Sequence, residues 1–221
     1  MAYRETPKTQ ARKADTKAKI LDAARQIIAL KGFSGLTVAT AAKQAGVATG
    51  SMYRYFPNKI ELCTALFRQL SGREVDEMRA IAKLDLSPAQ ALARCCFNFT
   101  QRAFRAPVQS YALMAEPLDP ALEMERLVYR RAYADVYQSI IERGIEAGDF
   151  EELDSHTASL AVVGMLAEPL LAPLHQFYCG ESAPYDSRKL ALSISRLCLN
   201  SLGAKDQLQD KDFNEQFNEY A

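Results

Sequence analysis

The chain has 221 residues, of which 48% are hydrophobic, and its 27 basic residues balance its 27 acidic ones. It has no run of about 18 apolar residues, so neither a membrane span nor a membrane partner is expected. The N-terminus lacks the apolar core of a secretory signal, which predicts a cytoplasmic protein. Five cysteines and two histidines show no metal-ligand spacing, so no metal or other cofactor is expected.

The charge is unevenly distributed although the total is zero. Residues 1–60 contain 11 Lys/Arg and three Asp/Glu, a net charge of +8, whereas residues 61–221 contain 16 and 24, a net charge of −8. A basic segment joined to an acidic one favours a part that binds a polyanion and a second part with another task.

The chain begins with a polar segment and a first helix. Residues 1–14 are predicted to be a flexible basic arm, whose cations could contact DNA or only solubilise the chain: Arg4, Lys8, Arg12 and Lys13. A helix from about residue 15 to Lys31 follows, and Gly32 ends it.

Two short helical patterns then meet at a glycine turn. Thr37 is a good N-cap for the first pattern, and Gly46 stops it. The second pattern covers about residues 49–55 and turns Met52 and Phe56 toward the core. Two short helices joined in this way are typical of the helix-turn-helix unit, whose second helix enters the DNA major groove.

The rest of the chain shows helical patterns and no strand pattern. Asn58 caps a long helix in a capping-box arrangement with Glu61, and Ser87 starts the next helix with Pro88 at its first position. The predicted helices cover about residues 58–83, 87–104, 119–147, 154–177 and 187–202. The fold class is therefore all-α, with a helix-turn-helix domain over 15–60, a larger helical domain over 61–203 and an acidic polar tail over 204–221.

Four segments of the N-terminal region resemble the DNA-binding domain of TetR-type transcriptional regulators. They are Phe33–Val38, Ala45–Val47, Gly50–Phe56 and Lys59–Leu62. The resemblance extends over about residues 16–65 and implies a homodimer that binds double-stranded operator DNA and responds to a small-molecule effector.

The DNA contacts are expected from side chains that face away from the core of this region. Arg54 can donate two bonds to a guanine or hold a phosphate, and the sequence leaves both roles open. Lys59 lies in the first turn of a helix, where the dipole disfavours a cation unless it captures a phosphate. The resemblance implies phosphate contacts for Tyr53 and Tyr55 and a close backbone approach at Gly50, which a crowded helix start would also explain. The predicted set is Thr37, Thr49, Gly50, Ser51, Tyr53, Arg54, Tyr55 and Lys59.

A dimer is expected through helices at about residues 156–177 and 187–202. Small residues on the first of these helices allow close approach: Ala158, Ala161, Gly164, Ala167 and Ala172. Its apolar residues are Leu160, Val163, Leu166 and Leu170. A helix buried within a monomer would look the same, and the dimer is favoured because the resemblance implies a four-helix interface here. Pro169 and Pro173 should kink this helix.

The middle helices are predicted to enclose a ligand pocket. Its candidate residues are Phe97, Arg102, Phe104, Tyr111, Met114, Tyr133, Tyr137, Met165 and His175. The competing interpretation is an ordinary core, because aromatic and methionine side chains at helical spacing usually pack against one another.

The leading hypothesis is a homodimeric transcriptional repressor that an effector releases from its operator. The alternative is an architectural or partner-recruiting DNA-binding protein without an effector, which a solid core would favour. The sequence has no Gly-rich phosphate loop and no recognisable catalytic set, so no enzyme is expected. The thiols are expected to be reduced and buried, with a redox role for Cys95, Cys96 or Cys179 as the alternative.

Overall fold

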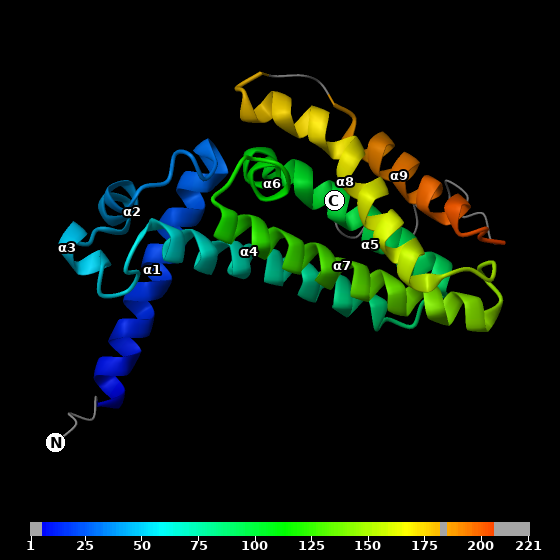
Figure 1. Ribbon diagram of the computed structural model, residues 1–221, viewed down its shortest axis with the longest axis horizontal. Helices are drawn as coiled ribbons and strands as arrows, with labels where there is room; N and C mark the ends of the chain where they lie inside the picture. Colours follow the sequence, from blue (N-terminus) through cyan, green and yellow to red (C-terminus); the bar gives the residue numbers. More distant parts are fainter. Residues whose placement is uncertain (1–5, 182–184, 206–221) are drawn as a thin grey trace.

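The computed structural model describes residues 6–181 and 185–205, and over these ranges the chain forms nine helices and no strand. The all-α fold class is confirmed. A small head built from the first helices lies at one end of a longer helical body (Figure 1). The acidic segment 206–221 and Arg4 lie outside the described residues.

The head consists of α1 (Pro7–Lys31), α2 (Val38–Ala45) and α3 (Thr49–Met52). Their buried faces meet in one apolar cluster, in which Ile20, Leu36 and Met52 are fully covered. The first turns of α4 (Lys59–Ala82) complete this cluster with Leu62 and Leu66. The predicted domain boundary at residues 60 and 61 therefore falls inside a helix that serves both the head and the body.

The first helix begins much earlier than expected. Residues 7–14 are the first two turns of α1, so the prediction of a flexible arm over this range is wrong. Thr6 accepts a hydrogen bond from the N–H of Thr9, and Pro7 occupies the first helical position. A capping threonine followed by proline is a standard helix start, and this local signal outweighs the polar composition of the segment. The cations Lys8, Arg12 and Lys13 are exposed on these turns.

The recognition helix is shorter than predicted. Gly46 ends α2 in the left-handed conformation, with φ of 66°, as the glycine turn requires. The next helix, α3, is a single turn over Thr49–Met52, and residues 53–55 continue as a turn. Ala48 is its N-cap and supplies no side-chain hydrogen bond, and Thr49 is the first helical residue.

The body consists of α4 and five further helices. These are α5 (Pro88–Arg105), α6 (Pro107–Met114), α7 (Pro120–Ala147), α8 (Ser155–Tyr178) and α9 (Ser187–Ser201). Asn58 accepts from the N–H of Glu61 as predicted, but the described contacts include no return bond from the Glu61 side chain, so the predicted capping box is only half formed. Ser87 and Gln90 make a reciprocal capping box. The sequence reading missed α6, which is only eight residues long and has no side-chain cap.

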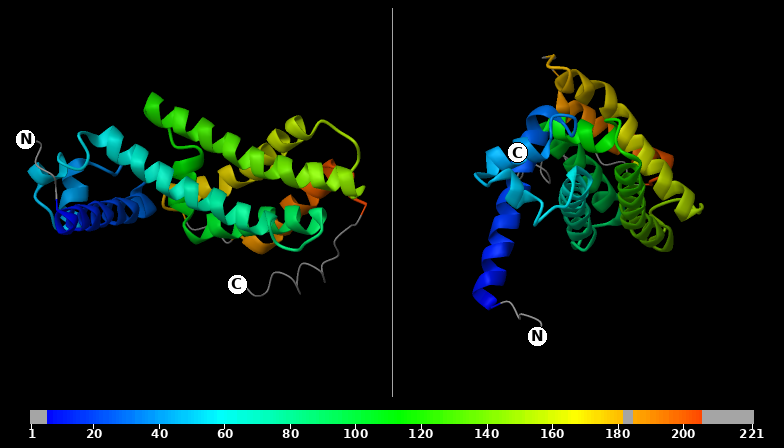
Figure 2. Two further views of the ribbon diagram at one scale, coloured as in Figure 1. Left: turned by 90° about the horizontal axis from the view of Figure 1, so that it is seen from below. Right: turned by 60° about the vertical axis from the view of Figure 1, so that its left-hand side comes forward.

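The body helices pack around Tyr137, which is fully buried. The helices α4 and α7 run side by side in the same direction, away from the head (Figure 2). The most extensive pairings are those of α5 with α9, α4 with α7 and α7 with α8. The helix α6 crosses beneath α8 and also contacts α1, so it lies at the junction of head and body. This junction positions the candidate site.

One helix of the described chain, α8, is long and apolar enough to span a membrane by length and composition alone. The sequence shows no continuous apolar run there because Glu168 and His175 interrupt it. In the monomer this helix packs on α6 and α7, while only a third of its most apolar window is buried. Its uncovered side includes Leu160, which is 45% exposed.

Candidate DNA interface and ligand cavity

The predicted DNA-contact residues gather at the tip of the head. Six of the eight are exposed, and Ser51 and Tyr55 are half-buried. Tyr53 is 54% exposed, which leaves its hydroxyl free of the core. A Cβ added at Gly50 would meet nothing within 4 Å, so the expectation of a crowded helix start is wrong. Nothing in the head itself requires glycine at this position.

Thr37 and Lys59 lie at the starts of two helices, α2 and α4. Thr37 Oγ1 accepts from the N–H of Thr40 at 3.0 Å, and Thr40 Oγ1 accepts from the N–H of Thr37 at 2.9 Å. This capping box fixes the entry into α2. Lys59 is the first residue of α4 and is exposed, next to backbone N–H groups that have no partner within the helix.

A buried carboxylate joins the head to the body. Glu116, in the connection from α6 to α7, is only 3% exposed. Its two oxygens accept from the backbone N–H groups of Phe33 at 2.8 Å and Ser34 at 2.7 Å, directly after α1. The hydroxyls of Ser34 and Tyr178, at the end of α8, lie 3.3 Å apart. We call these four residues the seam.

Gly32 is the backbone position that lets the seam close. Its φ of 64° and ψ of −171° belong to a region that only glycine occupies without strain. A Cβ at this position would lie 2.5 Å from Glu116 Oε2 and 2.7 Å from the ring of Tyr178. Glycine is therefore required both for the turn and for the close approach of the carboxylate.

Arg126 of α7 holds the end of α6 next to the seam. Its Nε donates to the carbonyl of Leu113 at 2.9 Å, and its Nη2 donates to the carbonyl of Glu116 at 2.7 Å. An ion pair with Glu123 at 2.8 Å fixes the guanidinium. Burial lowers the pKa of Arg126, but an arginine remains charged in proteins. Arg126 thus fixes both the C-terminal end of α6 and Glu116, whose carboxylate binds the head.

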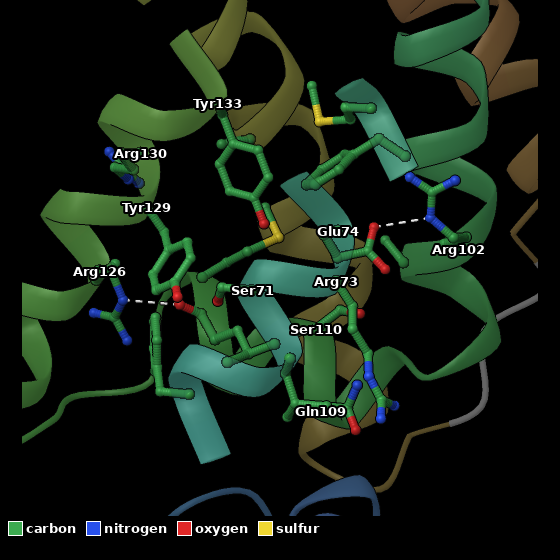
Figure 3. A pocket seen from close by; sticks show the side chains of 18 of the residues that line it. Ser71, Arg73, Glu74, Arg102, Gln109, Ser110, Arg126, Tyr129, Arg130 and Tyr133 are labelled. Carbon is green, nitrogen blue, oxygen red and sulfur yellow. Dashed lines mark hydrogen bonds and ion pairs between the residues drawn. The ribbon is translucent and has the colours of Figure 1, made fainter. Parts of the chain in front are cut away.

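A cavity of about 420 Å³ lies directly behind Arg126. Its walls come from α4, α5, α6, α7 and α8, and it reaches α1 at the junction with the head (Figure 3). The apolar part of the lining includes Phe67, Leu70, Met78, Phe99, Tyr133 and Leu166. Its cations are Arg25, Arg73, Arg102, Arg126 and Arg130. A volume between about 300 and 1,000 Å³ is typical of small-molecule sites.

The structure brings only part of the predicted pocket set together. Four residues line the cavity: Arg102, Met114, Tyr133 and Tyr137. The other five do not: Phe97, Phe104, Tyr111, Met165 and His175. Tyr111 instead stacks beside His175 and Tyr178, with ring centroids 5.1 and 4.8 Å apart, and Phe104 makes an edge contact with Phe177. These ring contacts join α6 and α5 to the C-terminal end of α8, outside the cavity lining.

Several lining residues escaped the sequence reading. Ser71 and Glu74 of α4 face the cavity, and Glu74 pairs with Arg102 at 2.8 Å. Tyr129 and Arg130 contribute from α7. A signal was present on α4, because Ser71 and Glu74 fall on the same helical stripe as buried apolar residues. Polar side chains on an otherwise apolar stripe often mark a cavity or a partner.

The outer face of α8 and α9 differs in detail from the predicted dimer face. Leu160 on α8 and Leu197 on α9 are 45% and 56% exposed. The small residues Ala161, Gly164 and Ala172 are also exposed. Four other predicted residues point inward instead: Leu166 and Leu170 are buried, and Val163, Leu166 and Ala167 line the cavity. The helical period, not the composition, decides which of these side chains remain free.

The thiols mostly lie in the core. Cys63, Cys95, Cys96 and Cys198 are buried, and Cys179 is exposed. Burial raises the pKa of Cys63 to about 11 and that of Cys95 to about 12, so both are protonated at neutral pH. The Cys179 thiol lies 3.5 Å from Nε2 of His175. Among the described residues, no group of three or more His, Cys, Asp or Glu is placed to hold a metal ion.

A helix-turn-helix head joined to a helical body with a ligand-sized cavity defines the class of one-component transcriptional regulators. Residues 20–66 match the family model of bacterial regulatory proteins of the tetR family, and residues 85–169 match that of the tetracyclin repressor-like C-terminal domain. Together the two matches cover more than half of the chain. The chain belongs to the TetR family of transcriptional regulators.

Relatives within this family include regulators of lipid metabolism. The chain is 25% identical over 190 residues to the fatty acid metabolism regulator protein of Bacillus subtilis, covering 85% of this chain and 95% of that one. It is 30% identical over 156 residues to the transcriptional regulator CymR of Pseudomonas putida, covering 66% and 76%.

Solved structures show the same fold. FadR of Bacillus halodurans superposes with a TM-score of 0.72 at 24% identity, covering 91% of this chain and all of that one. FadR of Bacillus subtilis in complex with stearoyl-CoA superposes with a TM-score of 0.69 at 25% identity, covering 82% and 96%.

Proposed function

We propose that this regulator is a homodimeric repressor that binds its operator through two heads and releases it when an anionic amphiphile fills the body cavity. The observation that carries the proposal is the position of the cavity, which shares Arg126 with the end of α6 and thus adjoins the seam. The alternative, an architectural protein without an effector, would suit a solid body rather than a hollow one. We infer no catalytic role and a cytoplasmic location, where the operator DNA of a bacterium lies.

The proposed DNA contacts divide into two kinds. Thr49 and Ser51 lie in the single turn of α3, and Arg54 follows it closely. These three residues are the candidates for contacts with base edges in the major groove. Thr37, Tyr53, Tyr55 and Lys59 are the candidates for phosphates, which set the position of the head. The open space at Gly50 supports close contact between the α3 backbone and the DNA. The net charge of +8 over residues 1–60 supports binding to a polyanion.

Replacing Lys59 by alanine is expected to weaken binding to operator and unrelated DNA alike. Each phosphate contact releases counterions, so its loss lowers the slope of log affinity against log salt by about one unit. Fluorescence anisotropy at several salt concentrations measures both quantities. Lys83→Ala, an exposed lysine at the far end of α4, is the matched control. An unchanged slope for Lys59→Ala would exclude the phosphate contact.

The lining of the cavity indicates the chemistry of the effector. Phe67, Met78 and Phe99 offer an apolar chain-binding surface, while five arginines supply positive charge. Only two carboxylates, Asp22 and Glu74, oppose them in the lining. An acyl chain with an anionic head fits such a site. The stearoyl-CoA complex of the Bacillus subtilis relative supports the same class of ligand.

The route from cavity to head follows from the contacts of Arg126 and α4. An effector changes DNA binding only if it binds the DNA-competent and DNA-incompetent arrangements with different affinities. An anionic group near Arg126 competes with the carbonyls of Leu113 and Glu116 for its guanidinium. It thereby weakens the contacts that hold Glu116, the residue that binds the head. The helix α4 provides a second route, because Leu66 packs in the head and Leu70 lines the cavity.

Filling the cavity is expected to abolish the effector response without loss of operator binding. Ala103 is buried on α5 and lines the cavity, so Ala103→Phe would occupy part of its volume. The variant should bind operator as the wild type does, whereas stearoyl-CoA should no longer release it. Anisotropy with and without stearoyl-CoA measures this, and a thermal melt confirms folding. Ala147→Phe, at the exposed end of α7, is the control. A normal response in Ala103→Phe would exclude the cavity as the effector site.

A further inference from the structure

A second hollow, of about 400 Å³, lies beside the cavity, between the C-terminal half of α4, the outer face of α5 and the start of α9. Four arginines line it: Arg94, Arg102, Arg105 and Arg188. Glu77 is the only carboxylate in its lining. We call this site the arginine groove. It shares Arg102 with the cavity, since that side chain lines both.

The sequence places these cations together by helical periodicity. Arg94, Asn98, Arg102 and Arg105 recur at intervals of three or four residues, so they lie along one face of α5. Arg188, in the first turn of α9, closes the groove from the other side. Its guanidinium lies 5.7 Å from the ring centroid of Phe97, and this stacking contact orients it.

Two buried donors in the groove have no hydrogen-bond partner among the described residues. They are Nη2 of Arg102 and Nε2 of Gln101. Each of these side chains also makes one hydrogen bond within the protein: Arg102 Nε donates to Glu74 at 2.8 Å, and Gln101 Oε1 accepts from Ser187. A buried donor left unpaired costs free energy, which a ligand with several acceptor oxygens would recover.

We propose that the arginine groove binds a phosphate ester. Phosphate oxygens accept several charge-assisted hydrogen bonds at once, and arginine presents its donors in a planar fork that matches them. The shared Arg102 points to one source, the phosphorylated head of an acyl thioester whose chain fills the cavity, and this part rests on the proposed function. A separate phosphorylated metabolite is the other source of the same chemistry.

Calorimetric titration of the full-length protein with stearoyl-CoA, stearate and CoA tests the site and separates the two sources. The double variant Arg105→Gln/Arg188→Gln removes two groove cations and keeps all residues of the cavity lining. It should bind stearoyl-CoA at least tenfold more weakly and stearate as the wild type does. Arg79→Gln/Arg131→Gln removes two exposed arginines outside both sites and should bind all three probes normally.

The possible results divide clearly. Equal affinities for CoA and stearoyl-CoA that the groove variant loses, with no binding of stearate, would support the phosphate site and overturn the acyl effector. Equal affinities of wild type and groove variant for stearoyl-CoA and CoA would overturn the phosphate site and leave the acyl effector standing.

Residues 206–221, with five acidic residues and one lysine, are the rival occupant of the arginine groove. If their removal shifts the melting temperature of the wild type but not of the groove variant, and CoA does not bind either protein, the groove holds this segment instead.

Discussion

Replacing Leu160 by glutamate is expected to convert the proposed dimer into a monomer and to lower operator affinity by about 100-fold or more. Leu160 is 45% exposed on the apolar outer face of α8, close to Ala161 and Gly164. A carboxylate buried there without a partner would oppose the association of two such faces. Linking two heads raises affinity by about 10² to 10⁴ through effective concentration alone, and a monomer loses this gain.

Sedimentation equilibrium and operator binding test this expectation together. Leu84→Glu is the control, because Leu84 is similarly exposed at 42% but lies just after α4, outside the exposed face of α8. The control should remain dimeric and bind operator normally. A Leu160→Glu protein that stays dimeric at micromolar concentration would show that the outer face of α8 is not the interface.

Replacing Glu116 by alanine is expected to destabilise the protein by about 2 to 4 kcal/mol and to uncouple the cavity from the head. The change leaves the N–H groups of Phe33 and Ser34 without their acceptors, and each buried unpaired group costs about 1 to 3 kcal/mol. The head then has no fixed polar contact with the α6–α7 connection. Operator affinity should depend less on stearoyl-CoA than it does in the wild type.

Chemical unfolding and the ratio of operator affinities with and without stearoyl-CoA measure the two effects. Glu125→Gln is the control, since Glu125 pairs with Arg68 on the surface of α4 and α7 and touches neither the head nor the seam. Gly32→Ala should resemble Glu116→Ala, because its Cβ would displace the same carboxylate. Wild-type stability and a wild-type effector response in Glu116→Ala would disprove the role of the seam.

The sequence by itself determined the features that depend on neighbouring residues. Caps at Thr37, Asn58 and Ser87 and the glycine after α2 fixed helix ends, because capping is a hydrogen bond across two or three residues. The turn between α2 and α3 and the basic N-terminal region could also be predicted, because both depend on the residues of one short stretch of the sequence. The early start of α1 also has a local cause, the cap at Thr6 followed by Pro7. The polar composition of residues 1–14 alone predicts a flexible arm instead.

Only the tertiary structure decided where the cavity and the seam lie. Glu116 and Phe33 are 83 residues apart, and no local pattern relates them. The helix α8 is apolar on nearly every side, so the orientation that turns Leu166 to the cavity and Leu160 to solvent comes from its packing on α6 and α7. Periodicity predicts that a helix has a buried face, whereas the void between several such faces depends on how all of them fit together.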